Sequence, residues 1–567
     1  MREYKKYAWS GLLCIGVEVV LEITVPLLMA DLIDYGVTNA DGTYIIKKGL
    51  QMALCAVLAL ILGVGSAKFS ALAGQGFGAN IRKAEYEKLQ SYSFSNIDHF
   101  SVSSLVTRLT SDVTNIQNAV STGMRPFGRS PVMLIFATSF AFRINSTLAL
   151  VFLVALPTLA VLLILIIINV GPLYGRMQSA IDQVNRCIQE NLTAIRVVKS
   201  YVRGDYEVEK FGVVNENLKS ESEKAFGTAV LNMPAMQFVM YGTILGILLI
   251  GGRLINEGQM MIGQLTSFLS YVLLILNSLM MMSNVFLLMT RSLASAERIM
   301  EVIDEKIDIT DENAKDIAVA KGEIEFDHVW FKYKDTAKEY VLSDVSFHIK
   351  PGQTVGIIGQ TGSSKTTLVQ LIPRLYDVTK GEVKIDGINV KEYPVRHLRD
   401  AVAMVLQKNT LFSGSLIDNL RWGNENATLD EIKEACQIAC VDEFVERLAD
   451  GYDTEMGQEG VNVSGGQKQR ICIARAILKK PKVLILDDST SAVDTATEAK
   501  IRSGLAEKLP DMTKIIIAQR ISSVRHADQI IIMDRGHVEA IGTHESLLRD
   551  NQIYQEIYAS QKEGADL

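Results

Sequence analysis

The hydrophobic pattern divides this 567-residue chain into two unlike halves that meet near residue 300. The first half contains long apolar stretches, whereas the second alternates short apolar runs with polar and charged segments. A helix needs roughly 20 apolar residues to cross a bilayer, so the shorter stretches must include flanking residues. We expect six membrane-spanning helices, built on residues 9–32, 50–72, 131–142, 148–170, 236–250 and 265–289.

The connections between these stretches alternate in length. Three are short, around residues 37–48, 143–146 and 251–263, whereas residues 75–125 and 172–228 form two much longer ones. The long connections are polar, helically patterned and rich in Lys and Arg, and basic connections remain on the cytoplasmic side of a membrane. We therefore expect the N-terminus, both long connections and the C-terminal half inside the cell.

Helices that extend far beyond the bilayer are either solvated stalks or levers that transmit motion to the soluble half. The lever interpretation predicts a short helix in each long connection that docks on the soluble half. We expect these helices near residues 96–108 and 203–211.

Composition agrees with this division and excludes some functions. Hydrophobic residues make up 48% of the chain and charged residues 21%, as expected when an apolar half and a soluble half are averaged. The net charge of −7 gives no basis for nucleic-acid binding, which needs a basic surface. The N-terminal apolar stretch is too long for a signal peptide and is expected to be a retained membrane helix.

The six cysteines are scattered, without the spacing of a zinc site. Cys436 and Cys440 would share one face of a helix. Packing as small apolar side chains explains them better than a redox pair does.

Two carboxylates, Glu18 and Glu22, lie four residues apart within the first apolar stretch. A carboxylate that faces lipid costs a few kcal/mol, so these side chains should face the protein interior or an aqueous cavity. Three roles remain open: contact with a cationic substrate, hydration in the cavity, or a structural ion pair with Lys68 or Arg143.

The second half predicts a different fold. Its short apolar runs alternate with helical segments, which is typical of an α/β domain. These runs lie at residues 323–326, 341–349, 354–358, 383–385, 402–405, 483–486, 515–517 and 529–533.

A glycine-rich loop lies between the run 354–358 and a helix-forming segment, and it nearly matches the P-loop pattern G-x-x-x-x-G-K-[ST]. Backbone N–H groups of such a loop surround phosphates at a helix N-terminus. The lysine contacts the terminal phosphates, and the following hydroxyl binds Mg²⁺. The expected nucleotide-binding residues are Gly359, Thr361, Gly362, Ser363, Ser364, Lys365, Thr366 and Thr367.

A second motif narrows the function. Val463 is followed by Ser464, Gly465, Gly466 and Gln467 at the start of a predicted helix, and the run 483–486 ends in Asp487 and Asp488. Here the sequence resembles the ATP-binding-cassette (ABC) family, whose signature reads L-S-G-G-Q. The resemblance covers essentially the whole chain and is to the family's half-exporters. It implies an α-helical transmembrane domain over residues 1–300, a linker over 301–321 and an α/β P-loop ATP-binding-cassette domain over 322–567.

The resemblance also implies roles for individual residues. Tyr333 would stack on adenine, Gln407 would touch Mg²⁺, and Asp487 would hold Mg²⁺ in part through water. Asp494 belongs to a loop that reaches across a dimer of two such domains. In this family the signature of one domain, here Ser464–Gln467, closes over the P-loop of the other. Two domains therefore enclose two ATP molecules, and neither site is complete within one chain.

Three residues depart from the family pattern. Asp488 stands where a glutamate polarises the attacking water, Gln519 replaces a histidine, and Ser364 replaces the last glycine of the P-loop. Aspartate is one methylene shorter than glutamate, and a displacement of about 1 Å can lower a rate about 100-fold. Independent drift in an active site is one explanation. Loss of the base and the histidine with retention of the binding residues favours a degenerate site instead.

This combination resembles asymmetric heterodimeric exporters. It implies a partner half-transporter that carries the catalytic Glu and His, and ATP-driven export of drugs, lipids or peptides by alternating access. The expected location is a bacterial inner membrane, with the ATP-binding domain in the cytoplasm. Two alternatives remain: an importer of exporter-like architecture, for example for metal chelates, and a nucleotide-gated regulatory subunit.

Overall fold

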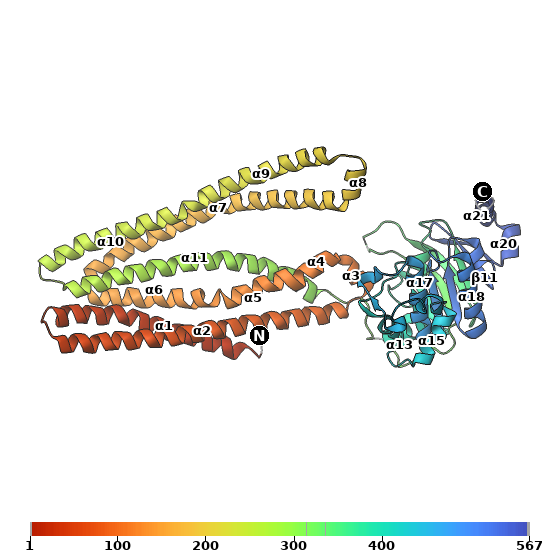
Figure 1. The fold of residues 1–567 in the computed structure, drawn as a ribbon, viewed down its shortest axis with the longest axis horizontal. Helices are drawn as coiled ribbons and strands as arrows, with labels where there is room; N and C mark the ends of the chain where they lie inside the picture. Colours follow the sequence, from red (N-terminus) through yellow and green to blue (C-terminus); the bar gives the residue numbers. More distant parts are fainter. Residues whose placement is uncertain (1–2, 313, 335, 564–567) are drawn as a thin grey trace. The chain divides into compact units, whose positions relative to one another are not determined.

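The computed structural model describes residues 3–563 except 313 and 335 (Figure 1). The chain divides into two compact units, one of Met1–Gln90 with Ser103–Asp304 and the other of Ser91–Val102 with Glu305–Leu567. A short segment of the N-terminal half, Ser91–Val102, thus belongs to the second unit. Each unit is described by itself.

The first unit is built of helices, most of them long. Within it, α1 and α2 lie side by side, and α7 packs along α9 (Figure 1). The elements are α1 (Lys5–Asp31), the π-helical turn η1 (Leu32–Val37), α2 (Gly42–Gln90), α4 (Val102–Thr107), the π-helical turn η2 (Arg108–Asp112), α5 (Val113–Ser121), α6 (Met124–Ile144), α7 (Ser146–Thr193), α8 (Ile195–Ser200), α9 (Gly204–Val230), α10 (Asn232–Asn256) and α11 (Ile262–Asp304).

All six predicted apolar stretches are helical, but they differ as candidate spans. Among the described residues, four helical segments are long and apolar enough to cross a membrane: Lys5–Val37, Gly42–Gln90, Gly204–Asn256 and Ile262–Met282. Ser146–Leu162 is apolar but shorter. The count of six spans therefore stays a prediction.

The tight turn predicted between the third and fourth stretches is confirmed. Asn145 is extended (φ −155°) and separates α6 from α7. Its side chain accepts a hydrogen bond of 3.0 Å from the backbone N–H of Leu148, which caps the N-terminus of α7.

A short helix lies in the first long connection, as predicted near residues 96–108, whereas the one predicted near residues 203–211 lies elsewhere. In the first connection, α3 (Phe94–His99) is short and lies in the second unit. In the second connection the predicted position was wrong, because the short helix is α8 and residues 204–211 already belong to the long helix α9. The chain reverses just before α9, where Val202 has a φ of +53°.

The carboxylates of the first apolar stretch pair with arginines of α6. Glu18 is buried and lies 2.7 Å from Arg125 and 3.4 Å from Arg129, and Glu22 lies 2.5 Å from Arg129. These arginines lie in the first turns of α6, ahead of the apolar stretch that marked this helix in the sequence. The pairings considered from the sequence, which were with Lys68 and Arg143, are therefore wrong.

The second unit contains two main sheets. The six-stranded sheet has the order β12-β11-β3-β10-β9-β6 and is parallel except for the pair β11–β12, and the four-stranded antiparallel sheet has the order β2-β1-β4-β5. All eight predicted runs overlap strands. The strands are β1 (Ile324–Phe331), β2 (Leu342–Ile349), β3 (Thr354–Ile358), β4 (Lys380–Ile385), β5 (Ile388–Asn389), β6 (Val402–Val405), β7 (Gly414–Ser415), β8 (Glu455–Met456), β9 (Val483–Asp487), β10 (Thr513–Ile517), β11 (Gln529–Asp534) and β12 (His537–Gly542).

Helices and short helical turns connect these strands, and two helices, α20 and α21, follow the last strand. They are α12 (Lys365–Gln370), η3 (Val390–Glu392), α13 (Val395–Ala401), α14 (Leu416–Arg421), α15 (Leu429–Ile438), α16 (Asp442–Val445), η4 (Gly451–Asp453), η5 (Gln458–Gly460), α17 (Gly465–Leu478), α18 (Thr495–Lys508), α19 (Ile521–Val524), α20 (His544–Asp550) and α21 (Gln552–Glu563).

The parallel strands bring the segments that follow them to one edge of the sheet. β10 pairs with β3 and β9, with Ile517 opposite Asp487, and β9 pairs with β6, with Leu486 opposite Val405. In open α/β sheets, ligands bind at the carboxyl ends of the strands. The P-loop and the segments after β6, β9 and β10 therefore meet at this edge.

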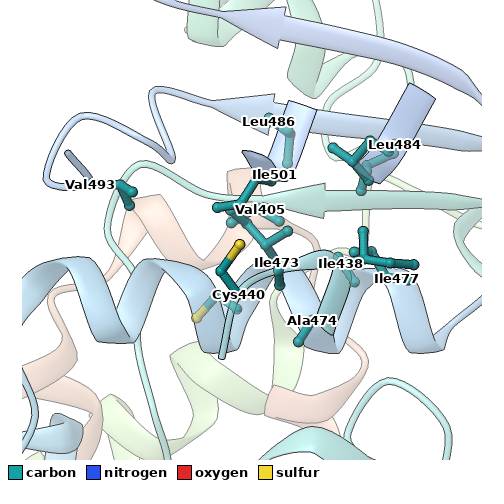
Figure 2. Close-up of a cluster of buried hydrophobic side chains, with 14 of the residues drawn as sticks. Val405, Ile438, Cys440, Ile473, Ala474, Ile477, Leu484, Leu486, Val493 and Ile501 are labelled. Atoms are coloured by element: carbon teal, nitrogen blue, oxygen red, sulfur yellow. The ribbon is translucent and has the colours of Figure 1, made fainter. Parts of the chain in front are cut away.

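A hydrophobic core fixes α17 to the sheet. Ile473 and Ile477 of α17 pack with Leu484 of β9 and with Cys440 in one buried cluster (Figure 2). Cys436 belongs to the same cluster, and burial raises the pKa of its thiol to about 12. Both cysteines are free, which confirms that they pack rather than pair. The prediction that they share a helix face was wrong, because α15 ends at Ile438 and Cys440 lies beyond it with a φ of +54°.

Candidate nucleotide-binding site

The P-loop connects the buried strand β3 to α12. The Nζ of Lys365 donates hydrogen bonds of 2.8 Å to the carbonyl oxygens of Gly359 and Gln360, so the amine lies inside the curve of the loop. Burial lowers the pKa of this amine, while the carboxylates of Asp487 and Asp488 oppose the shift. A half-buried cation at the N-terminus of a helix is a suitable environment for phosphate.

Ser364 explains how the P-loop tolerates its missing glycine. This residue is in the left-handed region, with φ +71° and ψ 23°, immediately before α12. A side chain costs roughly 1–2 kcal/mol in this conformation, whereas glycine adopts it freely. The loop therefore keeps the backbone shape that the usual glycine allows, at some cost in stability.

Thr366 and Asp487 form an oxygen pair suited to a hard cation. The hydroxyl of Thr366 donates a 3.0 Å hydrogen bond to Oδ1 of Asp487, and Asp487 is only 1% exposed. Its Oδ2 is buried and has no hydrogen-bond partner within the described residues. Burial raises the pKa of Asp487, as does the nearby charge of Asp488, whereas the bond from Thr366 lowers it. A buried carboxylate oxygen without a partner, beside a hydroxyl, fits Mg²⁺.

Gln407 lies two residues beyond β6, at the same edge of the sheet. Its carbonyl oxygen accepts a hydrogen bond of 3.4 Å from the side chain of Asn409. Within the described part of the chain, its side chain makes no hydrogen bond to Thr366 or Asp487. The role that the resemblance gives Gln407 therefore stays a prediction.

The two unusual residues of the hydrolysis site contact each other. The Nε2 of Gln519 donates a 2.9 Å hydrogen bond to Oδ2 of Asp488. The backbone N–H of Asp488 donates to the carbonyl oxygen of Ile517 at 3.1 Å, and φ of Asp488 is +47°. Burial raises the pKa of Asp488, whereas the bond from Gln519 lowers it. A neutral amide thus holds the carboxylate at the carboxyl ends of β9 and β10.

A residue of the C-terminal helix α21 holds the backbone next to Gln519 in place. Gln561 of α21 donates from Nε2 to the carbonyl oxygen of Gln519 at 2.7 Å and accepts at Oε1 from the N–H of Ile521 at 2.8 Å. The two bonds fix the backbone on either side of Arg520. Gln561 could not be identified from the sequence, because it lies far from the motif along the chain and belongs to no recognisable pattern.

The signature residues form the N-terminus of α17. Ser464 is the N-cap: its hydroxyl accepts a 3.3 Å hydrogen bond from the N–H of Gln467, and the Gln467 side chain accepts one of 2.9 Å from the N–H of Ser464. This reciprocal capping box leaves the first N–H groups of the helix directed outward. A Cβ at Gly466 would lie 2.7 Å from the carbonyl oxygen of Ala492, so this position accepts only glycine without a shift.

The signature helix also holds the loop that follows β9. Gln469 donates to the hydroxyl of Ser491 at 3.3 Å and accepts from the N–H of Ala492 at 3.0 Å. At the end of this loop, Asp494 caps α18 by accepting a 2.9 Å bond from the N–H of Thr497. Gln469 was also not identified from the sequence, and its burial within α17 makes it resemble a core residue.

Tyr333 connects the P-loop helix to α3. Its hydroxyl is hydrogen-bonded to that of Thr367 at 2.8 Å, and its half-exposed ring lies edge-on to Tyr376, with centroids 5.1 Å apart. Tyr376 is buried and donates a 2.6 Å hydrogen bond to Asp98 of α3. Tyr333, which is expected to stack on adenine, is thus linked through Tyr376 to α3, a helix of the first long connection.

Comparison with known proteins places these features in one family. A model of the ABC transporter transmembrane region matches residues 9–279, and a model of the ABC transporter matches residues 342–491. The chain is 38% identical to the uncharacterized ABC transporter ATP-binding protein YfiB of Bacillus subtilis, over 100% of this chain and 98% of that protein. It is 32% identical to the ATP-dependent lipid A-core flippase of Desulfotalea psychrophila, over 85% of this chain and 83% of the flippase.

A solved structure shares the fold. The structure of a bacterial Atm1-family ABC exporter with ATP bound superposes with a TM-score of 0.84, covers 98% of both chains and has 23% sequence identity. The chain therefore belongs to the ABC transporter family, as an exporter-type half-transporter in which a transmembrane domain is fused to an ATP-binding domain.

Proposed function

We propose that this chain is the degenerate-site subunit of a heterodimeric ATP-driven exporter. Its transmembrane domain would occupy residues 1–300, its linker 301–321 and its ATP-binding domain 322–567. The observation that carries the proposal is the 2.9 Å hydrogen bond between Gln519 and Asp488, a neutral amide and a short carboxylate at positions where a histidine and a longer base are expected.

The binding functions of the site are retained. Tyr333 stacks on adenine, the N–H groups of the P-loop and the amine of Lys365 hold the phosphates, and Thr366 and Asp487 hold Mg²⁺. The cation, when bound, neutralises charge on the β- and γ-phosphates. The proposal is supported by the inward amine of Lys365 and by Oδ2 of Asp487, which is buried without a hydrogen-bond partner among the described residues.

Hydrolysis at this P-loop is slow because the attacking water lacks a well-placed base. The Asp488 carboxylate falls more than about 1 Å short of the position of a glutamate carboxylate, and displacements of that size lower rates about 100-fold. Gln519 can donate a hydrogen bond to the γ-phosphate but cannot carry a positive charge. ATP bound at this site therefore acts mainly by stabilising the closed dimer of the two ATP-binding domains.

The signature of this chain serves the partner. Ser464–Gln467 present a helix N-terminus that completes the partner's ATP site, where a catalytic Glu and His hydrolyse ATP. Asp494 and the loop before it, held by Gln469, lie across the dimer interface. Closure of the two domains opens the transmembrane cavity outward, and hydrolysis in the partner's site resets the transporter.

The exported substrates are hydrophobic or amphipathic molecules. The relationship to a lipid A-core flippase and the fold shared with an Atm1-family exporter support export over import. The predicted location is a bacterial inner membrane with the ATP-binding domain in the cytoplasm. Transport of a fluorescent amphipath into inside-out vesicles tests the direction, because an importer would not accumulate it there.

Substitutions in the signature of each subunit test whether the two ATP sites contribute unequally to turnover. We expect Gly466→Ala in this chain to abolish ATP turnover by the heterodimer, because the added Cβ displaces the signature from the loop at Ala492. The equivalent change in the partner's signature should lower turnover by less than about threefold, since it completes only the slow site. Equal losses from both changes would contradict the proposal.

A further inference from the structure

A cavity of about 790 Å³ lies within the first unit, between α1, α2 and α11. Its walls are mostly apolar, with Val25, Leu60, Val64 and Leu273 among them. Three charged residues also line it: Glu18 and Glu22 of α1 and Arg125 of α6. An apolar cavity with a few convergent charged groups is the usual form of a small-molecule site.

Glu18 is the most buried residue of this charged group, and both of its carboxylate oxygens already have hydrogen-bond partners. Glu18 is 4% exposed, and its Oε1 accepts hydrogen bonds from Arg125 at 2.7 Å and from Arg129 at 3.4 Å. Its Oε2 lies 3.4 Å from the hydroxyl of Ser66. A Cβ at Gly63 would lie 3.1 Å from Oε1 of Glu18, so the glycine lets α2 pass close to the pair. Glu18 therefore holds the two arginines in position and offers little to a ligand.

Glu22 and Arg125 are more exposed, and among the described residues each still has hydrogen-bonding groups available for a ligand. The side chain of Glu22 is 27% exposed and accepts one bond, of 2.5 Å at Oε2, from Arg129, which leaves Oε1 available within the described residues. The side chain of Arg125 is 39% exposed and, among the described residues, uses one of its five N–H groups, in the bond to Glu18. The cavity thus offers one carboxylate oxygen and one guanidinium edge.

Charge balance selects the ligand. The two glutamates and two arginines of the group sum to zero net charge. A ligand with a single charge would leave that charge uncompensated in apolar surroundings, which is costly, whereas a ligand with both charges keeps the group neutral.

We propose that this cavity binds an amphipath whose polar end is zwitterionic. The cationic group of the ligand lies on Glu22, its anionic group lies on Arg125, and its apolar part lies against the aliphatic walls. This inference rests on the proposed function, since it names the class of substrate that the exporter carries.

Three octyl amphipaths that differ only in the polar end test the inference: octylphosphocholine, octyltrimethylammonium and octyl phosphate. Their dissociation constants are measured on the heterodimer in nanodiscs, below the micelle concentration of each compound. We expect octylphosphocholine to bind about tenfold more tightly than either of the other two compounds, because each of those carries charge of one sign only and lacks one of the two charged contacts.

Two variants test which charged group of the ligand contacts which residue. Glu22→Gln should weaken binding of octylphosphocholine and octyltrimethylammonium about tenfold and leave octyl phosphate unweakened, and Arg125→Gln should weaken octylphosphocholine and octyl phosphate instead. Glu257→Gln is the matched control, because Glu257 forms an exposed ion pair with Arg253 at 2.7 Å, outside the lining of the cavity.

Equal affinities of the wild-type protein for the three compounds would overturn the inference, and so would equal losses for all three in both variants. The wild-type comparison decides even if a variant does not fold. Binding is measured without turnover, and ATP-dependent uptake of a neutral dye into inside-out vesicles is measured separately. Failure of selectivity with intact uptake refutes only the inference, whereas loss of uptake refutes the proposed function.

Discussion

Replacing Asp488 by glutamate should accelerate hydrolysis at this chain's own P-loop. The carboxylate of Asp488 lies 2.9 Å from the amide of Gln519 at the ends of β9 and β10. One additional methylene extends it by about 1.3 Å. Because a misplacement of about 1 Å can cost 100-fold, the gain should approach 100-fold, or about 2.7 kcal/mol of barrier. We expect the largest gain when Gln519→His accompanies the change.

The assay is steady-state ATP turnover by the heterodimer after the partner's catalytic glutamate has been replaced by glutamine, so that turnover reports this chain's site. Asp316→Glu is the control, since the Asp316 side chain is 97% exposed. A gain below about threefold in both Asp488→Glu and the double variant, with unchanged ATP binding, would refute the geometric explanation.

Three further changes test the supports of the site. Gln561→Ala removes two hydrogen bonds of 2.7 and 2.8 Å around Gln519, each contributing about 1 kcal/mol, so amide hydrogen exchange in this loop should accelerate about tenfold. Tyr376→Phe removes the 2.6 Å bond to Asp98, so the amides of α3 should exchange at least about fivefold faster while ATP affinity stays within about twofold. Ser364→Gly relieves a left-handed serine (φ +71°), so the melting temperature of the ATP-binding domain should rise by about 2–4 °C.

Each of these changes has a matched control in the same unit. Gln555→Ala acts on the same helix as Gln561 but removes bonds to the carbonyl oxygens of Leu548 and Arg549, 2.9 and 3.1 Å long. Tyr393→Phe removes a buried bond to Ile385, also 2.9 Å long, rather than a bond to α3. Ser522→Gly, within α19, should lower the melting temperature. Equal effects of a variant and its control would contradict the role given to the variant.

The regular elements could be predicted because their signals are local. Each predicted strand is a short apolar run, and all eight overlap strands of the second unit. β12 was missed because its residues alternate between exposed and half-buried positions, so no apolar run marks it. The P-loop and the signature were recognisable because phosphate binding requires particular residues at fixed spacing.

The supports of the site could not be predicted because they depend on contacts between distant segments. Gln561 reaches Gln519 across 42 residues, and Gln469 reaches Ala492 across 23. Neither glutamine belongs to a periodic or motif-like pattern. The partners of Glu18 were wrong for the same reason, since only the packing of α6 against α1 determines which cations lie beside it.

The most direct test of the account is ATP turnover by this chain purified alone, with its genomic neighbour, and with the neighbour's catalytic glutamate replaced. We predict negligible turnover by the chain alone, robust turnover by the pair, and loss of that turnover when the neighbour's glutamate is changed. Robust turnover by the chain alone would contradict the account and make it a homodimeric exporter for which Asp488 and Gln519 suffice.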